Sequence, residues 1–133
     1  MPEQLKPKKL IMRDPPDAAL ALYNRVLLSV AKHNFIKERY YIPMVSNVME
    51  DLKLIRTDMV MVLEYEIVPS GLVDGWKQVI KNMGEMMGLS IGPGEMRAFL
   101  PYHIQTTMTD VIHLVFELMT RVYGYKGPFV QTA

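Results

Sequence analysis

The stretch Asp74–Gly88, DGWKQVIKNMGEMMG, sorts its residues onto two faces at the spacing of an α-helix. Apolar side chains recur every three or four residues and polar ones fill the positions between them, as on an amphipathic helix. Asp74 suits the N-cap, and Gly88 suits the position just past the C-terminus. The pattern therefore predicts a helix over 74–87. Its apolar face consists of Trp76, Val79, Ile80, Met83, Met86 and Met87.

Three other stretches carry the same spacing, and they predict helices over 17–41, 47–67 and 102–123. Proline or glycine lies near both ends of each stretch, which is typical of helix boundaries. We expect an all-α fold, a small helical bundle or helical hairpin. Its parts are a basic N-terminal arm over 1–14, a helical domain over 15–123 and a C-terminal tail over 124–133.

One segment has a competing interpretation. The residues Leu63–Ile67 alternate between apolar or aromatic side chains and acidic ones, which is the spacing of a half-buried strand. Short apolar runs fit helix and strand about equally well. The sequence therefore leaves open whether 59–68 is helix or strand.

Length and composition limit the classes of protein. The chain has 133 residues, of which 50% are hydrophobic and 22% charged, as expected for a single globular domain. It has no cysteine, which excludes disulfides, thiolate metal sites and a cysteine nucleophile. The longest uncharged run, Ala98–Thr109, is too short to span a membrane, so we expect no membrane span.

The charges are unevenly distributed. Residues 1–40 contain eight bases and four acids, a net charge of +4, whereas the remainder has seven bases and ten acids, a net charge of −3. Such asymmetry is typical of chains that bind a polyanion, although a solvated surface produces it too. Lysine and arginine bind phosphates without reading sequence. The predicted nucleic-acid contacts are Lys6, Lys8, Lys9, Arg13, Arg25, Lys32, Lys37 and Arg39.

Three of these bases form a stripe. Arg25, Lys32 and Arg39 recur every seven residues, so they lie along one narrow line of the helix over 17–41, with Ser29 beside it. The apolar residues of the same helix occur all round its axis, which predicts burial on every side. The helix over 47–67 has one apolar face for the core and a second strip, Leu54, Met61 and Tyr65. We predict that this second strip contacts another subunit.

No stretch of the sequence predicts an active site. Asp110, His113 and Glu117 share one helix face, but a carboxylate-bridged dimetal bundle needs further glutamates and a second Glu-x-x-His pair. The glycine-rich run Gly88–Glu95 lacks the lysine of a phosphate-binding loop. We therefore expect no metal, no cofactor and no enzyme activity.

With its basic segment up to Arg13, the stripe-bearing helix, the break at Pro43 and the apolar second helix, the chain resembles the major coat proteins of rod-shaped or filamentous archaeal double-stranded DNA viruses. The resemblance is one of layout and covers the chain in outline. It implies a virion subunit, assembled in the host cytoplasm, that forms a helical filament and packages double-stranded DNA. It also implies a partner subunit, either a second copy or a paralogous coat protein. The acids of the helix over 47–67 depart from the pattern of a DNA-lining helix.

Two other classes of function stay open. A small dimeric DNA-binding or regulatory protein would need a recognition helix with exposed base-reading side chains, and the sequence offers no clear candidate. A metal-dependent helical enzyme centred on His113 would hold stoichiometric metal when purified. Electron microscopy would distinguish a filament from a dispersed dimer.

Overall fold

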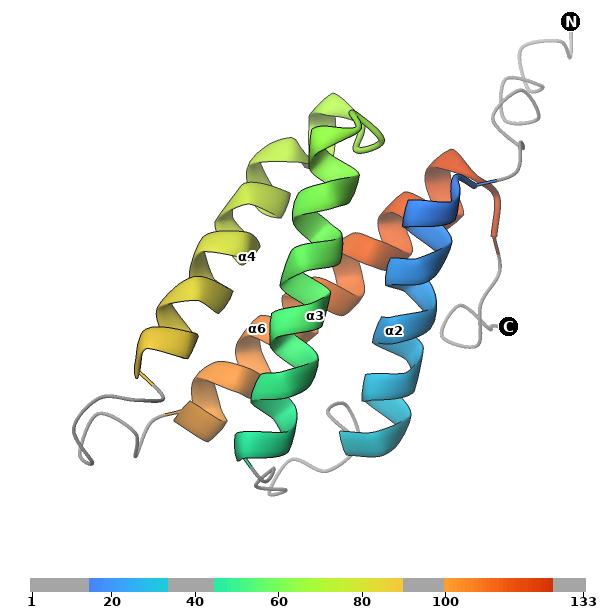
Figure 1. Cartoon of the computed structure of the whole chain (residues 1–133). Coiled ribbons are helices and arrows are strands. Elements are labelled where there is room, and N and C mark those ends of the chain that lie inside the picture. The colour runs from blue at the N-terminus through green and yellow to red at the C-terminus, as the bar shows by residue number, and fades with distance from the viewer. Residues whose placement is uncertain (1–14, 34–44, 90–99, 126–133) are drawn as a thin grey trace, which may run out of the picture.

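The computed structural model describes residues 15–33, 45–89 and 100–125, and every regular element in those ranges is helical (Figure 1). This confirms the prediction of an all-α fold. The elements are α2 (Asp17–His33), α3 (Val45–Glu64), α4 (Ser70–Leu89), α6 (Leu100–Glu117) and the π-helix η2 (Leu118–Val122). No helix in these ranges is long and apolar enough to cross a membrane.

The helices form a closed four-helix arrangement. α2, α3 and α4 lie side by side and alternate in direction, with α3 in the middle, and α6 crosses behind them (Figure 1). Each helix packs against the next along the chain, and α2 also contacts α6, which closes the ring. The exposed side of the α2–α3 pair therefore faces away from α6.

The core lies where the predicted apolar faces meet. Trp76 is fully buried, and its indole Nε1 donates a hydrogen bond of 2.9 Å to the carbonyl oxygen of Met59, which ties α4 to α3. Fully burying a large apolar side chain contributes about 1.5–3 kcal/mol to stability, so a continuous core of this size explains how the chain holds without disulfides. The buried face of α3 consists of Val48, Met49, Leu52, Ile55, Met59 and Val62, and it confirms the single core face predicted for this helix.

α4 begins earlier and ends later than predicted. Its first residue is Ser70, because Pro69 supplies the first helical carbonyl, which accepts a 2.9 Å hydrogen bond from the Leu72 amide. Proline suits this place since the first turn of a helix needs no amide donor there. The N-cap at Asp74 and the stop at Gly88 were therefore wrong, and both residues lie within the helix.

The end of α3 settles the helix-or-strand question for the segment 59–68. Met59–Glu64 is helical, and the chain then turns at Glu66, whose φ is 57°. The Glu66 amide donates to the Leu63 carbonyl at 3.0 Å, and the Ile67 amide donates to the Val62 carbonyl at 3.1 Å. These two bonds form a Schellman motif, which ends the helix. The strand alternative was wrong, and the helix stops three residues before the predicted 67.

The last helix changes its winding before it ends. α6 passes into the wider turns of η2, and Gly124, with φ 68°, terminates it as predicted. Tyr125 then folds back, and its ring meets that of Tyr23 edge-on at a centroid distance of 5.5 Å. Tyr125, which the sequence placed in the C-terminal tail, thus packs against α2. The rest of the tail, the 1–14 segment and the predicted extension of the first helix over 34–41 lie outside the described residues.

Candidate functional site: the exposed face of α2 and α3

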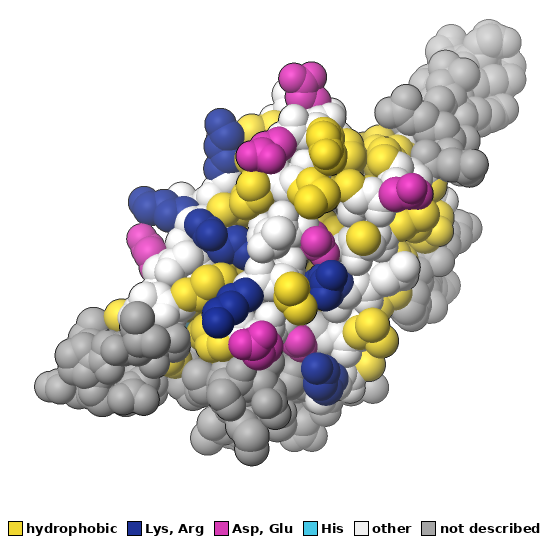
Figure 2. Space-filling model, viewed as in Figure 1, with side chains coloured by type: hydrophobic (Ala, Val, Ile, Leu, Met, Phe, Trp, Pro, Cys, Tyr) yellow, Lys and Arg dark blue, Asp and Glu magenta, His cyan; other side chains and the backbone are white. Residues whose placement is uncertain are grey.

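The second apolar strip of α3 is exposed, as the sequence predicted. Leu54, Met61 and Tyr65 keep 45%, 40% and 68% of their surface accessible. They are spaced seven and four residues apart along the outer side of α3, and Tyr65 follows its last residue, with its amide still bonded to the Met61 carbonyl at 3.0 Å, so the three lie in one row. Figure 2 shows hydrophobic side chains (yellow) along the surface over α3, set among acidic and basic ones. This row is the side of α3 that packs against nothing in the described part of the chain.

α2 extends the apolar surface, and here the sequence analysis was wrong. Leu28 is 69% exposed, and Ala21 and Ala31 are exposed on the same side of the helix. The prediction that α2 is buried on every side therefore fails, because α3 and α6 cover only part of its circumference. The signal was present in the sequence, since an all-round apolar helix in a small domain exceeds what two neighbours can cover.

The predicted basic stripe faces acids of α3. Arg25 Nε donates to Asp58 Oδ2 at 2.7 Å, and Lys32 Nζ lies 3.5 Å from Asp51 Oδ1. Ser29 Oγ donates to the other oxygen of Asp51 at 3.1 Å. Asp51 and Asp58 are spaced seven residues apart, as are Arg25 and Lys32, so the antiparallel helices bring the two pairs into register. The sequence analysis missed both aspartates as partners of the stripe.

These ion pairs reduce the positive charge that Arg25 and Lys32 present to a polyanion. Exposed ion pairs contribute only about 0–1 kcal/mol each, so they add little to the stability of the fold. A phosphate that approaches Arg25 must nevertheless compete with the Asp58 carboxylate, whose side chain is only 14% exposed. Lys32 keeps 57% of its side chain exposed and retains more freedom. The other predicted nucleic-acid contacts, Lys6, Lys8, Lys9, Arg13, Lys37 and Arg39, lie outside the described residues.

The outer edge of α3 carries charges of both signs. Lys53 Nζ lies 3.7 Å from Glu50 Oε2, and both side chains are largely exposed. Glu64 is exposed three helical turns beyond Lys53, on the same edge. Further round the helix on the same side, Arg56 Nε donates to the Ile80 carbonyl at 2.9 Å and so joins α3 to α4. The opposite edge carries Asp51 and Asp58, which pair with α2, so the apolar row of α3 is bordered by charge on both sides.

The grouping on α6 contains an ion pair and exposed side chains. Glu117 Oε2 accepts a hydrogen bond of 2.6 Å from Arg121 Nη1, while Asp110 and His113 are exposed. Within the described residues no three histidine, aspartate or glutamate side chains are close enough to hold a metal ion together. The absence of metal stays a prediction, tested by metal analysis of the purified protein.

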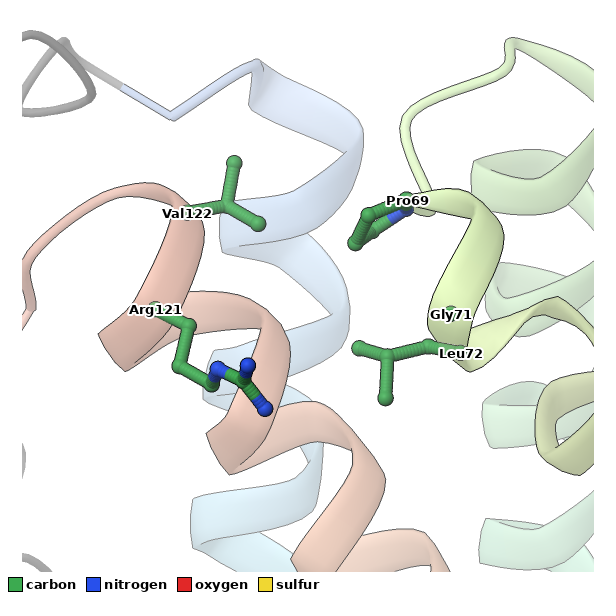
Figure 3. Close-up of a pocket in the computed structure, with 5 residues that line it drawn as sticks. All are labelled: Pro69, Gly71, Leu72, Arg121 and Val122. Carbon is green, nitrogen blue, oxygen red and sulfur yellow. The ribbon is translucent and has the colours of Figure 1, made fainter. Parts of the chain in front are cut away.

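A shallow pocket of about 300 Å³ lies between the start of α4 and η2. Pro69 and Leu72 point toward η2, which contributes Arg121 and Val122, and Gly71 completes the wall (Figure 3). Its walls are mainly apolar, and the guanidinium of Arg121 already pairs with Glu117. The pocket therefore lacks the convergent polar groups that position a small-molecule ligand.

One buried hydroxyl lies beneath this end of the bundle. The Tyr23 hydroxyl is buried and has no hydrogen-bond partner among the residues described. Burial raises the pKa of Tyr23 above 10.0, and the neighbouring Tyr125 adds to the rise. A neutral phenol at this depth is a packing group of the core, with rings of Phe116 and Tyr125 around it.

Comparison of the chain with protein-family models, curated proteins and solved structures gives no match. The proposals below therefore depend on the chemistry of the surface itself.

Proposed function

We propose that the protein is a structural subunit that assembles with other subunits and packages double-stranded DNA through phosphate contacts. The observation that supports assembly is the exposed apolar row of Leu54, Met61 and Tyr65 on α3. Leu28 of α2 widens it. Contiguous apolar surface bordered by polar residues is typical of protein–protein contacts. The partner is a second copy of the chain or a paralogous coat subunit.

The DNA part of the proposal is supported by charge and by the resemblance to coat proteins of archaeal rod-shaped or filamentous viruses. Residues 1–40 have a net charge of +4, and the tightest basic cluster is Lys6, Lys8 and Lys9 with Arg13. Contacts of this kind are sequence-independent and salt-dependent, which suits a coat that covers a whole genome. In this proposal the protein is a virion component assembled in the host cytoplasm.

The ion pairs of α2 indicate which of the basic residues should contribute most to DNA binding. Arg25 and Lys32 face Asp58 and Asp51, so we expect the basic segment before α2 to contribute more phosphate contacts than the stripe does. Each lost phosphate contact lowers the salt slope of duplex binding by roughly one unit. Replacing Lys6, Lys8 and Lys9 with alanine should therefore lower the slope by about three units. The double variant Arg25→Ala/Lys32→Ala should lower it by less than two.

The measurement is the affinity for several duplex sequences as a function of salt, with Lys77→Ala/Lys81→Ala on the exposed side of α4 as the control. The losses should be equal for all sequences. Electron microscopy of the same mixtures should show filaments on duplex DNA. If the parent protein has no affinity for DNA at low salt, or the lysine variants leave the slope unchanged, the DNA proposal fails and an assembly protein without DNA remains.

A further inference from the structure

The side chains on the two halves of the exposed row of α3 are chemically complementary to each other. The midpoint of the row lies between Thr57 and Asp58. Leu54 and Met61 are equally far from this point in sequence, one on each side, and so are Glu50 and Tyr65. At 100° per residue all four fall within about 60° of arc. In a second, antiparallel copy of the helix, Leu54 therefore lies opposite Met61, and the Glu50 carboxylate lies opposite the Tyr65 phenol.

The charged edge of the row carries charges of opposite sign on the two sides of the midpoint. Lys53 lies before the midpoint and Glu64 after it, on one edge of α3 and both exposed. When two copies of a helix pack antiparallel about a two-fold axis, the same edges meet and each residue faces its counterpart across the midpoint. Lys53 lies 4.5 residues before the midpoint and Glu64 lies 6.5 residues after it, so Lys53 of one copy and Glu64 of the other are offset by two residues, about 3 Å along the helix axis. A lysine side chain is long enough to span this offset, so the opposite charges come close, and this contact occurs twice per dimer.

The opposite edge of the row introduces no unpaired charge. It carries the Arg25–Asp58 ion pair, which is satisfied within each copy at 2.7 Å. α2 lies along this edge, and the antiparallel register places Leu28 of one copy opposite the exposed residues Ala21 and Asn24 of the other. A large side chain thus meets small ones, as close packing between helices requires.

From this self-complementarity we infer that the α2–α3 face binds the same face of a second copy, with the two α3 helices antiparallel about a two-fold axis at residues 57–58. The inference deepens the proposed function, because it identifies the partner as an identical chain and the contact as a closed pair. A larger assembly then forms from these pairs through other surfaces.

The charge contact provides a test that works without DNA. Lys53→Glu places two acidic pairs across the axis, and Glu64→Lys places two basic pairs there, so each variant should dimerise at least roughly tenfold more weakly than the parent. Mixing the two variants in equal amounts restores opposite charges at both contacts. The mixture should therefore form a heterodimer at close to the parent's affinity, and so should the doubly exchanged chain Lys53→Glu/Glu64→Lys.

Sedimentation of the full chain over a concentration series measures these affinities, and circular dichroism confirms that each variant is folded. The matched controls are Lys77→Glu and Glu85→Lys, which exchange exposed charges on α4 and should leave association unchanged. Met61→Glu should make the protein monomeric. A parent that stays monomeric up to about 1 mM, or a mixture that associates no better than its components, overturns the inference.

The result is separable from the test of the proposed function. If the variants dimerise as the charge exchange predicts but the protein does not bind DNA, the dimer contact is supported and the packaging proposal fails. If the protein is a monomer that binds DNA with the expected salt slope, the packaging proposal is supported and the dimer contact fails.

Discussion

Glu66 is the residue at which the backbone turns out of α3, and its replacement by glycine should stabilise the protein. Its φ of 57° lies in the left-handed region. An L-residue there costs roughly 1–2 kcal/mol, a penalty that glycine does not have. Glycine also gives the unfolded chain more freedom, which offsets roughly 0.4–1 kcal/mol of the gain. The expected net change for Glu66→Gly is a stabilisation of about 0.5–1 kcal/mol.

Loss of the glutamate side chain should add to this effect. Glu66 is exposed, and its negative charge lies beside the C-terminal end of α3, where the partial charge of the helix is also negative. The two hydrogen bonds of the turn use only backbone atoms of Glu66 and Ile67, so glycine retains both. The substitution therefore removes strain and repulsion without removing a contact made by the turn.

Urea unfolding at one fixed protein concentration measures the effect, because self-association would otherwise shift the midpoint. Glu66→Gly should raise the midpoint and leave the slope unchanged. The control is Glu85→Gly, an exposed glutamate inside α4 and away from the α2–α3 face, which should destabilise by about 0.5–1 kcal/mol because glycine is the poorer helix former. If Glu66→Gly lowers the midpoint, or if both variants move it in the same direction, the description of this turn is incorrect.

Two further substitutions test the packing of the bundle. Gly84→Ala should stabilise the protein by about 0.5 kcal/mol in urea unfolding, because alanine is the better helix former. The added Cβ would meet only the guanidinium of Arg56, at 3.1 Å, and this end of a flexible side chain can shift. A destabilised variant would show that the Arg56–Ile80 hydrogen bond outweighs helix propensity. Tyr23→Phe should leave stability at pH 7 equal or higher, because it removes a buried hydroxyl that lacks a partner within the described residues. Since the pKa of Tyr23 is raised above 10.0 in the folded state, the unfolded chain loses this proton first as pH rises. The parent should therefore lose stability above pH 10.0 more steeply than Tyr23→Phe, and equal pH profiles would contradict the buried position of the hydroxyl.

The helices and their core faces were predictable because both depend on local spacing. A residue such as Leu52 is buried because it lies one turn from Val48 and Ile55 on the same side of α3, and the sequence contains that relation directly. Boundaries were less predictable, since the end of α3 has no glycine to mark it. Glu66 adopts the left-handed conformation there, and α4 begins at Ser70, six residues after α3 ends.

The partners of the basic stripe could not be predicted from one helix alone. The spacing of Arg25 and Lys32 predicted that both lie on one side of α2, and both do. Whether it faces solvent or acids depends on the register of α2 against α3, which is a property of tertiary packing. The seven-residue spacing of Asp51 and Asp58 matches the spacing of the bases, and a search for such matched pairs between neighbouring helices would have found the ion pairs.

The same ion pairs bear on what the α2–α3 face can bind. Desolvating an unpaired charge at an interface costs several kcal/mol, whereas a charge that enters with its partner in place costs much less. Arg25 with Asp58, and Lys32 with Asp51, meet this condition beside the apolar row. A face whose charges are balanced internally has little net attraction for a polyanion, but it suits another protein surface of the same kind. In the proposed function, assembly and DNA binding would therefore use different parts of the chain, and substitutions on α3 should change association without changing the salt slope of DNA binding.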